Sequence, residues 1–362
     1  MNNDFGQTLP DPTPNLDLAR QMFRTFLDAT PRESRVVCLH DTDADGIAAG
    51  VVWQRAMQRI EYSNLVRVVP DRERNAWTPE NQRRVREFKP DALFVLDLGN
   101  QPLDVVPNVP TCFVDHHRPG QTRPDQTLIS AYSWNPVPNT SLIIYDLFSD
   151  LIDIADLDWI AAVGTFSDLG ERAPFSLVET TKKKYTAKWI KEATALVNAT
   201  RRASVSDPEA GARALLKFSS PKALCLSDDK DVQAMKTARE EVKAAMNEAK
   251  KAAPIFAGQV ALLRMNSKCQ IHPMIAQIWR GRLPKYIVIA ANEGYMDGRI
   301  NFSARSVNDT NVLQFLRGIE LSDGEGNFGH GHDGASGGSL PPARWNELLS
   351  KIGFSPEIGV QD

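Results

Sequence analysis

Short apolar runs alternate with stretches of helical spacing along the first half of the chain. Four such runs lie at residues 36–39, 65–69, 92–96 and 111–114, and we take residues 160–163 as a fifth. Each is only a few residues long and is bounded by turn or helix signals, which is typical of strands buried on both faces. Residues 16–28 instead place their apolar side chains at helical spacing. The alternation predicts a parallel sheet covered by helices on both faces.

The pattern changes from about residue 180 onward. Residues 181–218 have helical character, and residues 228–252 form a charged segment with little apolar face, which predicts a solvated helical connector. Pro254 ends that segment. The elements expected beyond it are strands at 259–265, 286–291 and 299–305, a helix at 312–319, a glycine-rich loop at 324–338 and a helix at 342–352. The Asp297-Gly298 pair predicts a hairpin between the last two strands.

The expected fold class is therefore α/β, with an N-terminal parallel-sheet domain and a smaller C-terminal α/β domain joined by a helical linker. A length of 362 residues is comfortable for two domains. The expected parts are a lead-in and helix at residues 1–30, the sheet domain at 31–220, the linker at 221–254 and the second domain at 255–362.

Composition limits the classes of function. A formal net charge of −3 gives no global basic field for long nucleic acid, so a phosphate-bearing substrate needs metals or a local cationic patch. The four scattered cysteines have no metal-ligand spacing, and two of them lie in apolar runs, which indicates buried thiols in a reducing compartment. No signal pattern and no membrane-length apolar stretch is seen, so we expect a cytoplasmic protein.

Acidic and imidazole side chains follow the apolar runs. The first run leads into His40-Asp41-Thr42-Asp43-Ala44-Asp45-Gly46, the third into Asp97, the fourth into Asp115-His116-His117 and the fifth into Asp168. In open α/β sheets this carboxyl edge is where ligands bind. Buried unpaired carboxylates are costly, and close acids repel one another, so their convergence favours a metal site.

Two alternatives apply to the acidic turn. It fits the first half of an EF-hand loop, but the twelfth position is Val52 and the segment before it is a strand. The second alternative is helix capping by Asp45, with Asp41 and Asp43 merely solvated. Repetition of the acid pattern after the other runs weighs against both.

The ligand set of Asp43, Asp45, Asp97, His116 and Asp168 is rich in oxygen, which suits Mn²⁺ or Mg²⁺ better than Zn²⁺. Five protein ligands exceed the needs of one magnesium ion. Two ions that share a bridging carboxylate fit better.

These motifs, in this order and at these separations, resemble the DHH family of phosphoesterases. DTDADG is similar to the first family motif, Asp97 to the second, Asp115-His116-His117 to the third and the Asp168 segment to the fourth. The C-terminal part resembles the DHH-associated domain in its Ser303–Ser306 strand and its glycine-rich loop at 329–338. His330 departs from that loop pattern, where glycine is usual.

The resemblance implies roles for these residues. One ion would be held by Asp43 and Asp97, and the other by Asp45, Asp97, His116 and Asp168, with Asp97 as the bridge. His117 would face the scissile phosphate and assist catalysis. Asp41 and His40 are adjacent candidates, and a strand-end or helix-cap role is an equal alternative for either. Residues that would bind the substrate phosphate or nucleotide from the second domain, across a cleft, are Ser303, Arg305, Gly331 and His332. The chemistry implied is in-line attack of hydroxide on a phosphodiester.

The C-terminal loop bears on the class of substrate. The glycine-rich loop is of the nucleic-acid-associated kind, so the resemblance leans to the RecJ-like and nanoRNase-like branch. We expect a manganese-dependent exonuclease or oligonucleotidase that trims short single-stranded DNA or RNA to mononucleotides, because we see no further binding module after residue 352. One alternative is a phosphoesterase for cyclic or linear dinucleotides or 3′-phosphonucleotides. Another is a non-catalytic nucleic-acid or replication-partner module, against which the presence of all the metal-motif acids argues.

Overall fold

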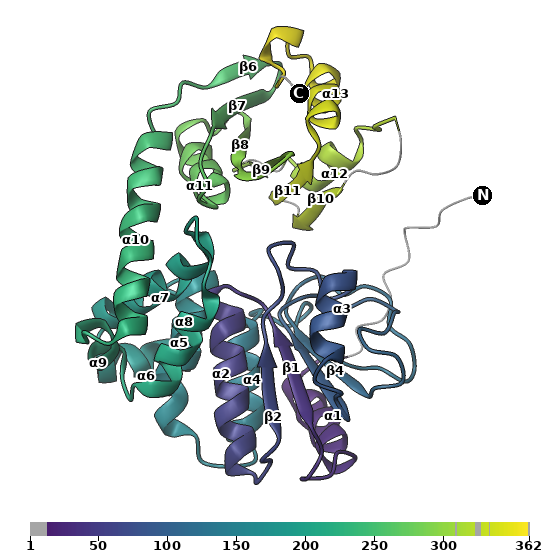
Figure 1. Cartoon of the computed structure of the whole chain (residues 1–362), viewed down its shortest axis with the longest axis vertical. Helices are drawn as coiled ribbons and strands as arrows, with labels where there is room; N and C mark the ends of the chain where they lie inside the picture. The colour runs from purple at the N-terminus through teal and green to yellow at the C-terminus, as the bar shows by residue number, and fades with distance from the viewer. Residues whose placement is uncertain (1–12, 308–309, 323–326, 333, 361–362) are drawn as a thin grey trace. The chain divides into compact units, whose positions relative to one another are not determined.

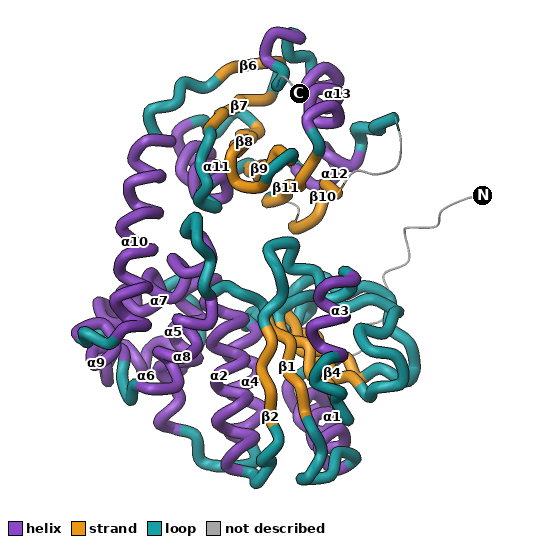
Figure 2. Tube along the Cα trace, in the orientation of Figure 1, coloured by secondary structure: helices purple, strands orange, loops and turns teal. Residues whose placement is uncertain are grey.

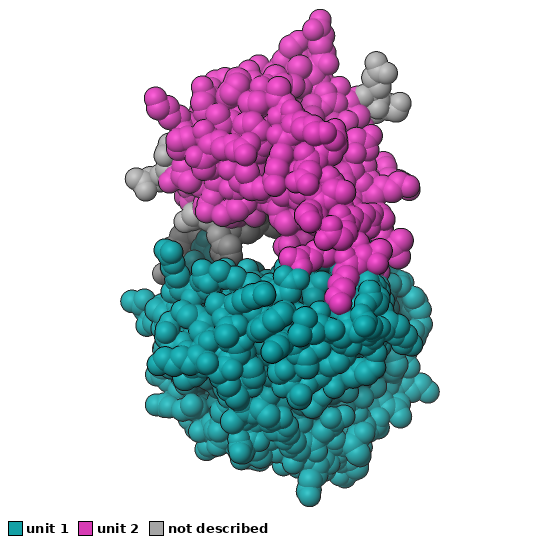
Figure 3. Space-filling model, turned by 90° about the vertical axis from the view of Figure 1, so that its left-hand side faces the viewer, with its two compact units in different colours: residues 1–201, 207–235 teal, residues 202–206, 236–362 magenta. Residues whose placement is uncertain are grey.

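The computed structural model describes residues 13–307, 310–322, 327–332 and 334–360. They form two compact units, the first of Met1–Arg201 with Asp207–Met235 and the second of Arg202–Ser206 with Lys236–Asp362 (Figure 3). No helix in the described ranges is long and apolar enough to cross a membrane. All four cysteines are buried, and none of these described residues forms a disulfide.

The first unit is built on a five-stranded parallel sheet of order β2-β1-β3-β4-β5. The strands are β1 (Val36–His40), β2 (Leu65–Val68), β3 (Ala92–Leu96), β4 (Thr111–Asp115) and β5 (Thr127–Ser130). The helices are α1 (Leu16–Asp28), α2 (Ala44–Arg59), α3 (Pro79–Arg86), α4 (Thr140–Ser149), α5 (Asp158–Asp168), α6 (Ser176–Tyr185), α7 (Ala187–Arg202), α8 (Pro208–Lys217) and α9 (Pro221–Leu226), with the 3₁₀ turn η1 (Ala155–Leu157). The predicted α/β class is confirmed (Figure 1, Figure 2).

Alternate residues of each strand face opposite sides of the sheet, and both sides are buried. Val36 and Cys38 lie in a large core with α1, α2, α4 and α5. Val37 and Leu39 face a smaller core, which is covered by α3 and the loops that follow β2 and β3. The central strands β1, β3 and β4 are fully buried and mainly apolar, and polar side chains gather at their ends.

Helix α2 lies close to β1 because it carries glycine where a side chain would collide. A Cβ atom at Gly50 would come within 2.3 Å of the buried His40 ring. We expect Gly50→Ala to destabilise the first unit by about 2 kcal/mol in urea unfolding, since overpacking forces the helix away from the strand. Gly281→Ala, at a helical position with open space around it, should be neutral or slightly stabilising. Equal stability of the two variants would contradict this packing.

The second unit contains a six-stranded sheet of order β10-β11-β9-β8-β7-β6, in which only β7 and β8 pair in parallel. The strands are β6 (Ile255–Ala257), β7 (Val260–Met265), β8 (Ile287–Met296), β9 (Arg299–Arg305), β10 (Asn327–His332) and β11 (Ala335–Leu340). The helices are α11 (His272–Arg282), α12 (Val312–Arg317) and α13 (Pro342–Ile352), followed by the 3₁₀ turn η2 (Pro356–Ile358). The predicted β8–β9 hairpin is confirmed, with Gly298 in the left-handed region at its turn.

Three expectations were wrong. Residues 160–163 belong to helix α5, whose residues from Asp158 to Phe166 are all buried, so the segment lacks the polar face that marks a helix. Within the expected loop at 324–338, the described residues form the β10–β11 hairpin. Helix α10 (Lys230–Ala249) is not merely solvated, because Val232 and Val242 are each buried in a core.

One half-buried acid in the first unit, Asp146, gives a pH dependence of stability. Desolvation raises the pKa of Asp146 to about 6, although the nearby Arg20 opposes the shift. Between pH 4 and 6 the folded state therefore binds more protons at this group than the unfolded state, and its contribution to stability falls as the pH rises through that window. We expect Asp146→Asn to stabilise the protein by about 1 kcal/mol at pH 7 and by nothing at pH 4, measured by urea unfolding. If Asp146→Asn were stabilised equally at pH 4 and at pH 7, the raised pKa of Asp146 could not be the cause.

Candidate metal centre

The polar groups predicted at the strand ends meet at one edge of the first sheet. Because β1, β3 and β4 are parallel neighbours, their carboxyl ends bring Asp41, Asp97 and Asp115 to the same edge. Asp168 reaches this edge from the last residue of α5, by a helix in place of the predicted strand. Three groups of acids and histidines form here, with ligand atoms within 4.8 Å of one another in each: Asp97, Asp115, His116 and His117; Asp45, His116 and Asp168; Asp41, Asp43 and Asp97.

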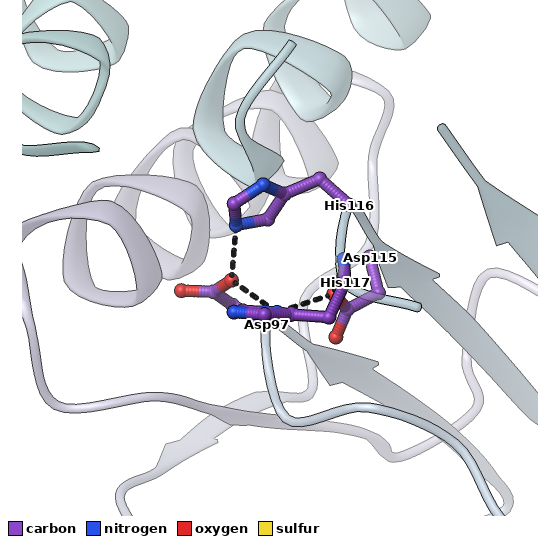
Figure 4. Close-up of side chains that lie close together, drawn as sticks. All are labelled: Asp97, Asp115, His116 and His117. Carbon is purple, nitrogen blue, oxygen red and sulfur yellow. Dashed lines mark hydrogen bonds and ion pairs between the residues drawn. The ribbon is translucent and has the colours of Figure 1, made fainter. Parts of the chain in front are cut away.

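His116 points its ring toward Asp97 (Figure 4). Its Nε2 atom lies 3.3 Å from Asp97 Oδ1, 3.5 Å from Asp168 Oδ2 and 3.9 Å from Asp45 Oδ2. This nitrogen is buried and has no hydrogen-bond partner among the described residues. A buried polar atom without a partner is costly, so the arrangement is one that a ligand should complete.

The spacing fits a divalent cation. Nitrogen and oxygen ligands about 2.1 Å from one ion and at right angles lie about 3 Å apart, close to the separations around His116. One imidazole with three carboxylates suits manganese or magnesium. Asp45, Asp97, His116 and Asp168 are therefore able to hold one ion.

A second group, of Asp41, Asp43 and Asp97, lies beside the first, and Asp97 connects the two because its Oδ1 lies 3.3 Å from His116 Nε2. Asp43 caps α2 by accepting hydrogen bonds at Oδ1 from the Asp45 and Gly46 amides, at 3.0 and 3.1 Å. The helix cap is thus Asp43 and not Asp45. Its other oxygen lies 3.3 Å from Arg74 Nη2 and 3.6 Å from Arg201 Nη2. One oxygen of Asp43 thus caps helix α2, and the other faces the two arginine side chains.

Asp41 is buried and strongly held. Arg74 donates to both of its oxygens, with Nε 2.6 Å from Oδ1, and the Thr42 amide donates to Oδ1 at 2.7 Å. A carboxylate engaged in this way is fixed in position. The structure therefore places the catalytic candidate Asp41 next to the acids, paired with Arg74.

Asp97 adopts a backbone conformation unusual for a residue with a side chain. Its φ angle is +64°, in the left-handed region that favours glycine. The residue is nevertheless buried, and it belongs to two of the three acid groups. A strained backbone at the shared carboxylate is consistent with a functional constraint on this position.

Asp115 lies outside the acid group around Asp168 and forms hydrogen bonds with His117. Its Oδ1 accepts from His117 Nδ1 and from the His117 amide, each at 2.7 Å, while Oδ2 accepts from the Gly99 amide at 2.6 Å. Desolvation opposes ionisation, but the two neighbouring histidines outweigh it and hold the pKa of Asp115 below its usual range. Because a carboxylate only accepts, Nδ1 carries the proton. The His117 side chain is 43% exposed and so remains accessible.

The acids perturb one another. Desolvation and mutual repulsion raise the pKa of Asp45, raise that of Asp97 well above its usual value, and raise that of Asp168 to about 7. The same two causes favour a cation, because a divalent ion between the carboxylates offsets both.

His40 is a structural residue in this arrangement. It is fully buried, its Nδ1 donates to the Asp41 carbonyl at 2.8 Å, and its Nε2 accepts from Arg67 at 3.0 Å. Desolvation and the Arg67 charge lower its pKa well below the usual value, so the ring is neutral. Both ring nitrogens are used within the fold.

Sequence reasoning missed a polar segment that contacts the acids. Asn139, Thr140 and Ser141, at the start of α4, donate hydrogen bonds to Asp45, and the Thr140 hydroxyl donates to Asp97. A capping asparagine before an apolar run is a helix-start signal, but nothing in the sequence shows which acid such a helix end would meet.

The substrate-binding residues expected in the second unit lie on two of its strands. Ser303 and Arg305 are on β9, paired with Gly337 and Ala335 of β11. Desolvation and the nearby Arg280 lower the pKa of Arg305 to about 10, so it is still charged at neutral pH. The backbones of Gly331 and His332 lie in β10, and their side-chain surroundings fall outside the described residues.

Comparisons with known proteins agree with these motifs. Residues 35–164 match the family model described as DHH family, N-terminal domain, and the resemblance to that family is confirmed there. No curated protein matches the chain. Three similar solved structures are RecJ from Thermus thermophilus in complex with Mn²⁺ (17% identity, TM-score 0.67, 94% of this chain and 55% of that one), an exonuclease RecJ bound to manganese (17%, 0.59, 94% and 96%) and CDC45 from Entamoeba histolytica (8%, 0.55, 93% and 98%).

The chain spans about half the length of the Thermus RecJ chain. At these identities the likeness establishes the fold alone. The fold is RecJ-like: a parallel-sheet DHH domain followed by a second α/β unit.

Proposed function

We propose that this protein is a two-metal phosphodiesterase that hydrolyses short single-stranded oligonucleotides from an end, releasing mononucleotides. The observation that carries the proposal is the position of Asp97, which groups with Asp41 and Asp43 and lies 3.3 Å from His116 of the Asp45–His116–Asp168 group, with an accessible histidine, His117, beside it. Such a pair of acid groups is the arrangement of a two-ion centre that stabilises both the attacking and leaving oxygens of a phosphoryl displacement.

The residues divide between two ion positions. Asp45, His116 and Asp168 would hold one ion and Asp43 the other, with Asp97 shared and Asp41 adjacent. Bound divalent ions neutralise phosphate charge and lower the pKa of water. The protein's own contribution is to hold these carboxylates at fixed separations around His116.

His117 is the residue best placed to move a proton or stabilise charge. Asp115 fixes its tautomer through Nδ1 and orients the ring. The Asp115 and Asp97 carboxylates outweigh desolvation and raise the pKa of His117 to about 9, so the ring carries positive charge at neutral pH in the absence of bound ions. A protonated imidazole suits charge stabilisation on a phosphate or donation to a leaving oxygen.

Two further facts support a small nucleic-acid substrate. The formal net charge of −3 leaves long strands without a general electrostatic attraction, whereas a short oligomer needs only local contacts. The similar structures include an exonuclease RecJ bound to manganese that this chain matches over nearly its whole length. Ser303, Arg305, Gly331 and His332 remain our candidates for binding the substrate, with the Arg305 guanidinium suited to a phosphate.

A substrate panel tests the proposal. Dinucleotides, cyclic dinucleotides, 3′-phosphonucleotides, short oligomers and long single strands of DNA and RNA, labelled at either end, are incubated with Mn²⁺ or with Mg²⁺, and the products are resolved by size. We expect mononucleotide release from short oligomers, with rates that fall as length increases. Hydrolysis confined to dinucleotides or 3′-phosphonucleotides would favour the small-molecule alternative. Absence of hydrolysis with either metal would contradict the proposal and favour a non-catalytic module.

A further inference from the structure

The first turn of α4 contacts two of the candidate metal ligands directly. The Thr140 amide donates to Asp45 Oδ2 at 2.9 Å and the Ser141 amide donates to Asp45 Oδ1 at 2.8 Å. The Asn139 side-chain amide also donates to Asp45 Oδ1. All four residues are fully buried. The carboxylate of Asp45 thus lies at the positive end of a ten-residue helix and accepts three hydrogen bonds from it.

These contacts restrict how Asp45 can bind an ion. Oδ1 already accepts two hydrogen bonds and Oδ2 accepts one. Oδ2 is also the oxygen 3.9 Å from His116 Nε2. The segment therefore presents Asp45 to the centre through a single oxygen of fixed direction.

The Thr140 side chain orients the second ligand. Its hydroxyl donates to Asp97 Oδ1 at 3.0 Å, and this is the same oxygen that lies 3.3 Å from His116 Nε2. Thr140 thus reaches both acids, Asp45 with its amide and Asp97 with its hydroxyl. Thr140 is itself fully buried.

A third link joins the segment to the helix that carries Asp168. The Ser141 hydroxyl donates to the Ala161 carbonyl of α5 at 3.1 Å. A Cβ atom at Gly164 would come within 2.1 Å of that hydroxyl oxygen and 2.9 Å of Asp45 Oδ1, so only glycine allows α5 to approach this closely. The segment is therefore in contact with Asp45, with Asp97 and with the helix that ends in Asp168.

We propose that residues 139–141 are a positioning element of the metal centre, in which the Thr140 hydroxyl sets divalent-ion affinity by orienting Asp97 relative to Asp45 and His116. The inference rests on the proposed function only in requiring that the centre bind a divalent ion. It needs no particular substrate. Residues that hydrogen-bond metal ligands commonly change metal affinity by roughly 10- to 100-fold when they are replaced.

The test measures Mn²⁺ binding by titration calorimetry on EDTA-treated protein. Thr140→Val removes the hydroxyl and keeps the shape, and we expect about 10-fold weaker Mn²⁺ binding. Thr140→Ser keeps the hydroxyl and should restore most of the affinity. The matched control is Thr181→Val, since Thr181 is equally buried but donates to the Leu177 carbonyl of its own helix. That control should leave Mn²⁺ affinity unchanged.

A second readout is the rise in melting temperature on addition of Mn²⁺, which should shrink in Thr140→Val and not in Thr181→Val. If Thr140→Val does not fold, Thr140→Ala is compared with Thr140→Ser. Wild-type affinity in every folded variant that lacks the hydroxyl would overturn the positioning role alone. Failure of the wild-type protein to bind Mn²⁺ or Mg²⁺ at all would overturn the proposed function as well.

Discussion

Replacement of Asp97 by glycine should reduce metal-dependent hydrolysis by at least a factor on the order of 10³ while the protein stays folded. Asp97 groups with Asp41 and Asp43 and lies 3.3 Å from His116 Nε2, so both proposed ion positions would lose a ligand when its carboxylate is removed. Glycine adopts the φ angle of +64° without strain, and the change also relieves repulsion between buried acids. The measurement is kcat/KM with Mn²⁺, together with the melting temperature in EDTA.

Asp97→Ala is the matched control for this prediction. It removes the same carboxylate but keeps a Cβ atom at a positive φ, so it should be as inactive as the glycine variant and about 1 kcal/mol less stable. Activity that survives in either variant would show that the assignment of the centre is wrong.

Replacement of His117 by alanine should lower kcat by roughly 10²- to 10⁴-fold and leave Mn²⁺ affinity close to that of the wild type. The reason is that Asp115 holds the imidazole by Nδ1 and leaves the ring partly exposed, which is the geometry of a residue that acts on substrate. Kinetics under saturating Mn²⁺ and calorimetric titration of the ion separate the two effects.

Asp115→Asn provides the companion variant. An amide oxygen accepts a weaker hydrogen bond from His117 Nδ1 than a carboxylate does. We therefore expect kcat to fall by a smaller factor than in His117→Ala, and the dependence of kcat on pH to shift. His117 also lies near enough to Asp97 to serve as an ion ligand, at 3.7 Å from Nδ1 to Oδ1. Loss of Mn²⁺ binding in His117→Ala would therefore contradict a role on substrate and favour ligation.

The strand ends could be predicted from sequence because a parallel sheet buried on both faces leaves a simple pattern. Residues 92–96 and 111–114 are apolar without interruption after their first residue, and each run is followed at once by an acid. Since parallel neighbours share an edge, Asp97 and Asp115 had to come together there. The placement of Asp168 at the same edge was also expected, although the element that carries it was wrong.

The error at α5 has a physical cause. From Asp158 to Phe166 every residue is buried, so the helix is packed on all sides and its sequence lacks the periodic polar face that distinguishes a helix from a strand. Only the length of the element, eleven residues in the structure, distinguishes such a buried helix from a buried strand. The helix matters for function because Gly164 brings it against Asp45 and Ser141.

Contacts between distant segments could not be predicted. The residues that orient Asp45 follow it by 94 to 96 positions, and the Thr140–Asp97 bond joins positions 43 apart. Asn139 and Thr140 look like ordinary helix-capping residues in sequence, because their other role depends on where the helix lies. The pairing of Arg74 with Asp41 is of the same kind, since an arginine in a polar loop does not indicate its partner.

We propose that Asp97 lies between two divalent ions, and anomalous scattering from a Mn²⁺-soaked crystal would locate those ions. We expect two manganese peaks, both within ligand distance of Asp97, with His116, Asp45 and Asp168 around one and Asp43 beside the other. A single peak at His116 would contradict the bridging role, and peaks away from Asp97 would contradict the metal centre itself.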